Sequence, residues 1–184
     1  IKGLGDEKLW LCPSLNDSAN DISGNGNDGV YQNGTATVSD TDATYGGTRA
    51  YFSNAQSQYV LVSNFGDSLN ETTSISMWVK SVNPWVCVPV ANGGLGYSAS
   101  IWQYALFNSG TSRLLYRRSS TLTLSGATPS NQWQHICIIR DNGSSTQEVY
   151  INGVLDVTSA SFTGTYYTNE TWFGFGNAIG TNEE

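Results

Sequence analysis

The chain has 184 residues, which suits one domain, and hydrophobic residues make up 39% of it, enough to build a core. Its 15 acidic and 8 basic residues give a formal charge of −7, which argues against nucleic acid as a partner because phosphate binding needs clustered lysine and arginine. No apolar run approaches the length that spans a bilayer, so membrane insertion is not expected. Charged residues are only 12% of the chain, and neutral polar residues replace them, a composition associated with β-rich extracellular and virion proteins.

Short apolar or alternating runs recur along the chain between clusters of Gly, Asn, Ser and Asp, and no window combines helical periodicity with a capping signal. In chain order, the runs predict strands over residues 8–12, 29–32, 49–53, 58–63, 73–82, 85–90, 98–107, 113–117, 132–141, 148–156 and 171–176. Many short strands without helices predict an all-β fold, a jelly-roll sandwich of two antiparallel sheets.

The stretch DISGNGNDGVY, residues 21–31, concentrates glycines and side-chain oxygens directly before a predicted strand. One interpretation is purely structural, because Gly, Asn and Asp favour the tight turns that could deliver Val30 and Tyr31 to a sheet. The other is a calcium site, because Ca²⁺ takes about six to eight oxygens from carboxylates, amides and backbone carbonyls. The candidate calcium ligands are Asp21 first, and then Asn25, Asn27 and Asp28. The spacing lacks the closing glutamate of an EF-hand loop.

The later strands show the alternation of a sheet with one buried and one wetter face. In residues 73–82 one face would carry Ile75, Met77 and Val79, and the other Ser76, Trp78 and Lys80. Residues 132–141 are partly apolar on both faces, which predicts a central strand. The pair Asn152-Gly153 between apolar flanks predicts a hairpin turn, because both turn positions need positive φ.

Four segments, in order, carry a resemblance to a known family: LWLCPSLNDSANDISGNGNDGVY, AYFSNAQSQYVLV, TSISMWVKS and NQWQHICIIRDNGSSTQEVYINGVLD. Together they cover most of residues 8–156 and resemble the laminin-G-like branch of the concanavalin A-like lectin/glucanase superfamily. The resemblance implies a single concanavalin A-like jelly-roll domain over residues 1–184, with one structural Ca²⁺ near the Asp21 turn in many members.

The C-terminal end departs from the family pattern. Family members end with a strand close to Gly-x-Ile-Asp-Glu-Val-Arg-Ile-Tyr, whereas this sequence ends with GNAIGTNEE. Either the polypeptide continues past Glu184 or the last strand differs. Some members use the aspartate of that strand as a calcium ligand, so its absence bears on the metal site.

The sequence favours a non-catalytic domain. Glycoside hydrolysis needs two carboxylates facing each other, and the acidic residues here are scattered singly through turns. His135 is the only histidine, and the sequence contains no Gly-x-Ser-x-Gly motif that would supply a nucleophilic serine. We therefore interpret His135 as a structural, hydrogen-bonded residue. Cys12, Cys87 and Cys137 lie in apolar runs without a CxxC pair, which favours buried reduced thiols over a redox or metal role.

A candidate ligand face lies in residues 84–118, the part least similar to the family. Its candidate binding residues are Trp85, Tyr97, Trp102, Tyr104, Tyr116 and Arg118. Aromatic rings can stack on the C–H faces of sugars while Arg and Asn bind hydroxyl groups. The alternative is that these residues fill the core or a subunit interface.

Two functions follow from these observations. The first is a lectin-like recognition or adhesion module that binds a glycan or cell-surface polysaccharide from an extracellular or virion surface. The second is a structural phage or virion protein, such as a capsid decoration, head-fibre or tail component, that uses the jelly roll to assemble with other virion proteins or as a homo-oligomer. The odd thiol count and the low charge favour a virion setting, and a glycan hydrolase is the least favoured function.

Overall fold

The computed structural model describes residues 19–34, 36–39, 48–52, 58–63, 73–80, 88–92, 104–109, 113–118, 121–124, 132–141, 144, 146–160 and 172–176. These ranges contain 13 strands and no helix. The described part of the chain accordingly offers no helix that could cross a membrane.

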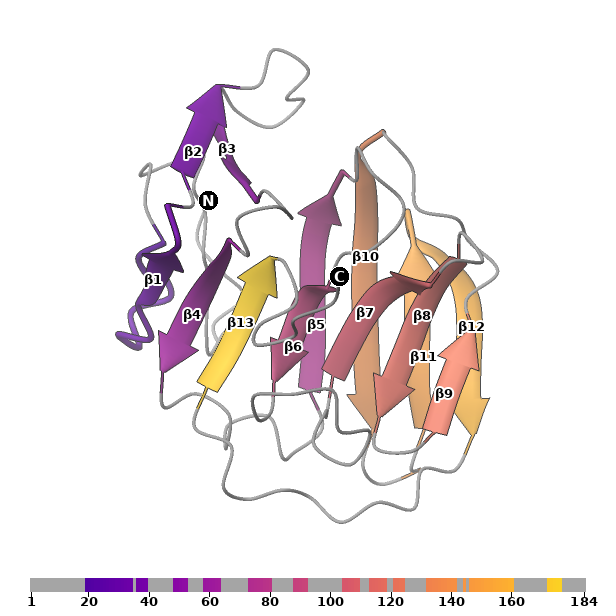
Figure 1. Cartoon of the computed structure of the whole chain (residues 1–184). Coiled ribbons are helices and arrows are strands. Elements are labelled where there is room, and N and C mark those ends of the chain that lie inside the picture. Colours follow the sequence, from indigo (N-terminus) through magenta and orange to yellow (C-terminus); the bar gives the residue numbers. More distant parts are fainter. Residues whose placement is uncertain are drawn as a thin grey trace.

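Most strands belong to two antiparallel sheets (Figure 1). The larger sheet contains, in spatial order, β1 (Gly29–Gln32), β4 (Tyr59–Ser63), β13 (Trp172–Gly176), β6 (Val88–Asn92), β7 (Tyr104–Ser109), β8 (Arg113–Arg118) and β9 (Thr121–Leu124). The smaller sheet contains β12 (Val154–Ala160), β11 (Thr146–Ile151), β10 (Gln134–Asp141) and β5 (Thr73–Val79). A separate pair is formed by β2 (Ala36–Ser39) and β3 (Thr48–Tyr51).

The smaller sheet lies behind the β6–β9 part of the larger one in Figure 1. The contact between β9 and β12 joins the two sheets at one side. Two layers of antiparallel strands confirm the predicted two-sheet sandwich.

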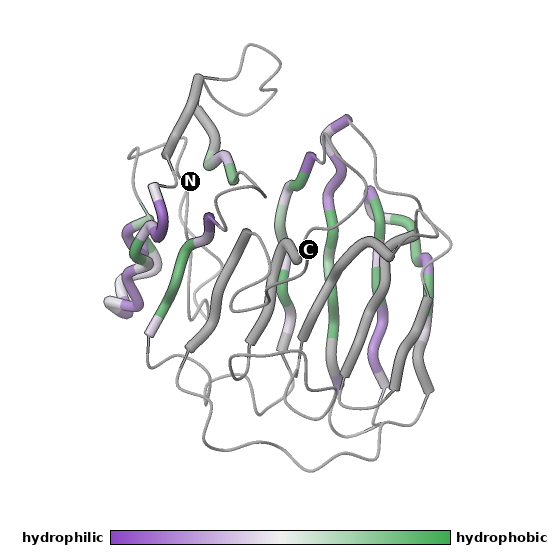
Figure 2. Tube along the Cα trace, in the orientation of Figure 1, coloured by the Kyte–Doolittle hydropathy of each residue, from purple (hydrophilic) through white to green (hydrophobic). Residues whose placement is uncertain are grey.

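The inner face of the smaller sheet supplies much of the described core. Ile138 of β10 lies opposite Ile75 of β5 on one side and Val149 of β11 on the other. Ile136 and Ile138 have no exposed surface, and full burial of such a side chain contributes about 1.5–3 kcal/mol. Figure 2 shows the matching hydrophobic segments along β4 and β10.

The strand pattern agrees with several predictions in detail. β10 pairs with both β11 and β5, which confirms that residues 132–141 form a central strand. Asn152 and Gly153 have φ values of 52° and 80°, which confirms the predicted hairpin turn between β11 and β12. The predicted strand over residues 8–12 lies outside the described residues.

Other strands were missed or are only partly described. β2 and β9 were not predicted, because ATVS and TLTL are only four residues long and at least half of the residues in each are small or polar. The strands predicted over residues 85–90 and 98–107 are observed at Val88–Asn92 and Tyr104–Ser109. The first residues of both predictions, 85–87 and 98–103, lie outside the described residues.

Candidate functional site

The turn before β1 is organised around one carboxylate. Asp21 Oδ1 accepts a hydrogen bond from the Ser23 backbone N–H at 2.9 Å. Asp21 Oδ2 accepts two more, from the Ser23 hydroxyl at 2.8 Å and from the Asn27 N–H at 3.0 Å. The Asp21 N–H in turn donates to Asp28 Oδ1 at 2.8 Å. The side chain of Asp21 therefore ties together residues up to six positions apart.

The same turn depends on two residues with left-handed backbone. Gly24 and Gly26 have φ values of 96° and 74°, a region that side-chain-bearing residues rarely adopt. Between them, Asn25 donates from its Nδ2 to the Ser23 hydroxyl oxygen at 2.9 Å. The strand that follows is anchored by a 2.8 Å hydrogen bond from the Gly29 N–H to the Ala19 carbonyl.

These contacts bear on the predicted calcium site. The turn gathers all four candidate ligands, Asp21, Asn25, Asn27 and Asp28, and both carboxylates also serve as acceptors for hydrogen bonds within the turn. In the described residues, no group of three or more His, Cys, Asp or Glu side chains is placed to hold a metal ion. The remaining oxygens of a calcium shell would have to be amide or backbone carbonyls or water. Calcium binding at this turn stays a prediction.

The predicted ligand face is only partly described. Trp85, Tyr97 and Trp102 lie outside the described residues. Tyr104 lies on β7, and Tyr116 and Arg118 lie on β8.

Register places these last three positions on one face of the larger sheet. Tyr116 lies opposite Leu106, which is two residues after Tyr104. Tyr104 lies opposite Asn92, Asn92 lies opposite Phe173, and Phe173 lies opposite Val62. These residues therefore share one face of the sheet. Val62 is fully buried. The structure thus brings the three positions to one face, and their role in ligand binding stays a prediction.

A second candidate surface was not singled out as a site from the sequence. We define the outer face of the smaller sheet by the side chains that point away from the buried isoleucines, namely Ser74, Ser76, Trp78, His135, Cys137, Ile139, Asp141, Thr146, Glu148 and Tyr150. The structure leaves 45% of Trp78 exposed. The alternation in residues 73–82 already placed Trp78 opposite the apolar positions, and that signal could have identified it.

Trp78 lies in a defined contact with its neighbours. It lies opposite His135, and the two ring centroids are 5.2 Å apart with the planes tilted by 52°. His135 Nε2 and the Ser76 hydroxyl form a 2.8 Å hydrogen bond. The backbone of His135 is fixed as well, because its N–H donates to Asn152 Oδ1 at 2.9 Å and its carbonyl accepts from the Asn152 N–H at 2.8 Å.

The Ser76–His135 pair has the spacing of a nucleophile and its base, but the described residues supply no third partner of a triad. Among the described residues, no carboxylate hydrogen-bonds to the other ring nitrogen of His135. A triad needs that partner to orient the imidazole. The observed bonds fit the predicted structural role of this histidine.

Two further groups on the outer face have shifted pKa values. The Tyr150 hydroxyl donates a 2.7 Å hydrogen bond to Glu148 Oε2, and this bond raises the pKa of Tyr150 above its ordinary value. Burial raises the pKa of the Cys137 thiol. Cys137 is free and half-buried, in agreement with the expectation of a reduced thiol. Cys12 and Cys87 lie outside the described residues.

Solved structures share this fold. Domain 4 of AbnA, a GH43 extracellular arabinanase from Geobacillus stearothermophilus, solved in complex with arabinotriose, superposes with a TM-score of 0.61 at 21% identity over 89% of this chain and 80% of that chain. The binding domain of Paraclostridial Mosquitocidal Protein 1 gives a TM-score of 0.64 at 18% identity, over 89% of this chain and 43% of that one. A structure of botulinum neurotoxin type C, from work on the dependence of its cell entry on two ganglioside molecules, gives a TM-score of 0.62 at 17% identity. The match covers 96% of this chain and 44% of that one.

The chain spans less than half of the two toxin structures, and at these identities the likeness shows the fold alone. Comparison with curated protein sequences gives no match. The family model described as the concanavalin A-like lectin/glucanases superfamily matches residues 53–184, well over half of the chain. The chain therefore belongs to the concanavalin A-like lectin/glucanases superfamily.

Proposed function

We propose that this chain is a non-catalytic, lectin-like module that binds a glycan or cell-surface polysaccharide at an extracellular or virion surface. The observation that carries the proposal is the fold shared with domain 4 of the arabinanase, a domain of similar extent whose structure contains arabinotriose. This support is an analogy of fold, and a fold can host several functions. The low charge and the neutral polar composition support a location outside the cell.

The contacts of three of the five described carboxylates support binding without catalysis. A glycosidase needs an acid and a second carboxylate that face each other across a bound sugar. Asp21 and Asp28 share a turn, but both accept backbone hydrogen bonds that build the turn. Glu148 accepts a hydrogen bond from Tyr150. These carboxylates are occupied by structural contacts.

A structural role in a virion is the second candidate, and one observation favours it. Val154 and Leu155, at the start of β12, are 69% and 49% exposed. Neighbouring exposed apolar side chains are often covered in an assembly. Light scattering coupled to size-exclusion chromatography distinguishes the two functions, since a stable symmetric oligomer favours the structural protein and a monomer favours the lectin.

The proposed function is tested by binding to immobilised glycans, followed by calorimetry with each positive sugar. We expect saturable binding of at least one glycan by the monomer and no release of reducing sugar. Release of reducing ends at a rate above that of a heat-inactivated sample would show catalysis. A protein that binds no glycan on the array would contradict the proposal.

A further inference from the structure

The outer face of the smaller sheet contains an exposed aromatic ring that is held in place. We call Ser76, Trp78 and His135 together the Trp78 patch. The tilted His135 ring packs against Trp78, and the Ser76 hydroxyl holds the His135 ring. Trp78 nevertheless keeps 45% of its surface exposed. A ring already ordered by its neighbours loses little entropy when a ligand stacks on it.

Polar groups lie on one side of the Trp78 ring. The Ser76 hydroxyl and the His135 imidazole lie beside it, and the Tyr150–Glu148 pair lies on the next strand of the same face. Neighbouring strands lie about 4.8 Å apart, so Tyr150 is about 10 Å across the sheet from the strand of Trp78. This distance of about 10 Å exceeds the width of one sugar ring. An apolar ring with hydrogen-bonding groups at its side is the combination that sugar recognition needs.

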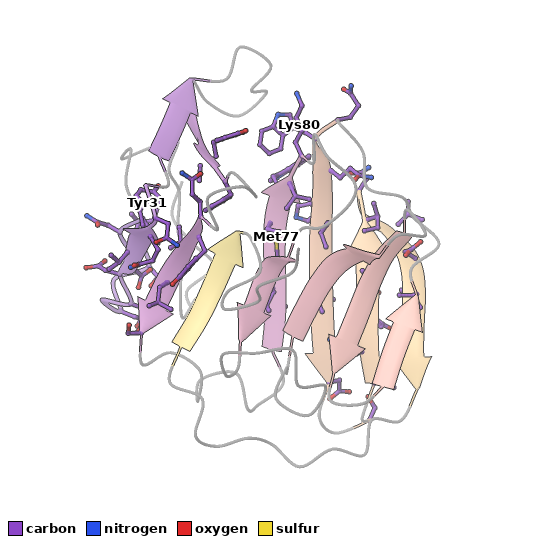
Figure 3. All side chains as sticks on the ribbon, viewed as in Figure 1. Tyr31, Met77 and Lys80 are labelled. Atoms are coloured by element: carbon purple, nitrogen blue, oxygen red, sulfur yellow. The ribbon has the colours of Figure 1, made fainter. Side chains whose placement is uncertain are left out.

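The charge of this face bears on whether it binds neutral or anionic glycans. Two carboxylates, Glu148 and Asp141, belong to the outer face as defined above, and one cation, Lys80, directly follows the end of β5 (Figure 3). The whole chain has a formal charge of −7. An acidic surface repels sialylated and other anionic sugars, whereas a neutral sugar suffers no such repulsion.

We propose that the Trp78 patch binds a neutral glycan, with one sugar ring stacked on Trp78 and its hydroxyl groups bonded to the flanking side chains. The inference rests on the proposed function and assigns it a site. It locates that site on the outer face of the smaller sheet, whereas Tyr104 and Tyr116, the two described aromatic residues of the predicted ligand face, lie in the larger sheet.

The sequence provides two built-in reporters for a test on the unmodified protein. His135 is the only histidine and Met77 the only methionine, so their ring and methyl NMR signals are each unique. They lie on opposite faces of the sheet, because Met77 shares its face with Ile75. Arabinotriose and neutral trisaccharides of glucose, galactose and mannose are titrated in, with sialyllactose as the charged comparison. We expect a neutral sugar to shift the His135 signals and leave the Met77 methyl unchanged.

Variants then measure the affinity for the sugar that binds. Trp78→Ala should weaken binding at least about tenfold, and Trp78→Phe should restore part of it, because stacking needs an aromatic face. Ser76→Ala should weaken it about threefold through loss of one polar partner. Tyr51→Ala is the matched control, since Tyr51 of β3 is also 45% exposed but lies outside both main sheets.

The outcomes separate the site from the function. If the protein binds a glycan but His135 does not shift and Trp78→Ala binds normally, the site is wrong and the proposed function stands. If sialyllactose binds more tightly than every neutral sugar, the assignment to neutral glycans is wrong. If Trp78→Ala converts a dimer into a monomer without changing glycan affinity, the face is an interface between copies of this chain. If the wild-type protein binds none of these sugars, the neutral-glycan site is wrong, and the glycan array alone decides whether the proposed function stands.

Discussion

Tyr150 and Glu148 lie two residues apart on β11, and the phenol of Tyr150 donates a 2.7 Å hydrogen bond to Glu148 Oε2. Side chains two positions apart share a face of a strand, so the pair lies entirely on the outer face of the smaller sheet. The bond holds only while the phenol keeps its proton, because a phenolate has no hydrogen to donate. The pair therefore couples the protonation of Tyr150 to the folded state.

This coupling predicts a pH dependence of stability. The hydrogen bond to Glu148 raises the pKa of Tyr150 above its ordinary value of 10.0, and burial acts in the same direction. A raised pKa means that the folded state holds the proton more tightly, so the stabilisation is complete below about pH 10 and is lost as the pH rises through the folded pKa. Urea unfolding between about pH 9 and 11 should show a steeper loss of stability for wild type than for Glu148→Ala, which removes the acceptor. Superimposable curves would show that the bond is absent in solution.

A second prediction concerns the turn before β1. Asp21→Ala removes the acceptor of three hydrogen bonds from Ser23 and Asn27, and we expect a loss of about 1–3 kcal/mol of unfolding free energy even in metal-free buffer. The control is Asp28→Ala, which removes one described bond at an exposed residue and should cost less. Chemical denaturation measures both changes. Equal effects would mean that Asp21 does not organise the turn.

Calcium at this turn is tested separately from the hydrogen bonds. A ligand that binds only the folded state stabilises it by mass action, so calcium should raise the melting temperature of a chelator-treated sample. Asp21→Ala should abolish that rise, because Asp21 is the first candidate ligand. Magnesium serves as the control cation, since it demands a stricter octahedral geometry. Identical melting curves in chelator and in calcium would rule out a calcium site in this chain.

The sequence predicts the buried side of a strand and a tight turn better than it predicts a short strand. Alternation identified the buried side of β5, because a two-residue period with one face in the core leaves few alternatives, and Ile75 is 8% exposed. The Asn152-Gly153 turn was equally clear, because few residues accept positive φ. β2 and β9 were missed because a four-residue strand is defined by its partner strand more than by its own composition.

The candidate site was less predictable than the fold. Sequence reasoning recognised that the polar stretch at Asp21 forms a turn, but the set of side-chain bonds depends on backbone angles that a sequence does not specify. Alternation in residues 73–82 placed Trp78 on the face opposite Ile75 and Met77, but it did not identify the residue that Trp78 contacts. The contact of Trp78 with His135 joins two strands at positions 57 residues apart in sequence, and only the register reveals that contact.

The last prediction concerns a polar group inside the sandwich. Gln147 of β11 is only 2% exposed, and its Nε2 has no hydrogen-bond partner in the structure described here. Leaving a buried donor unpaired costs about 1–3 kcal/mol, so Gln147→Met, which keeps a similar volume, should raise the unfolding free energy by about 1 kcal/mol. Gln58→Met is the control, because the Gln58 amide is also buried but donates to the Asn33 carbonyl at 3.2 Å, and its loss should destabilise the protein. If Gln147→Met also destabilises the protein, the Gln147 amide has a partner in solution.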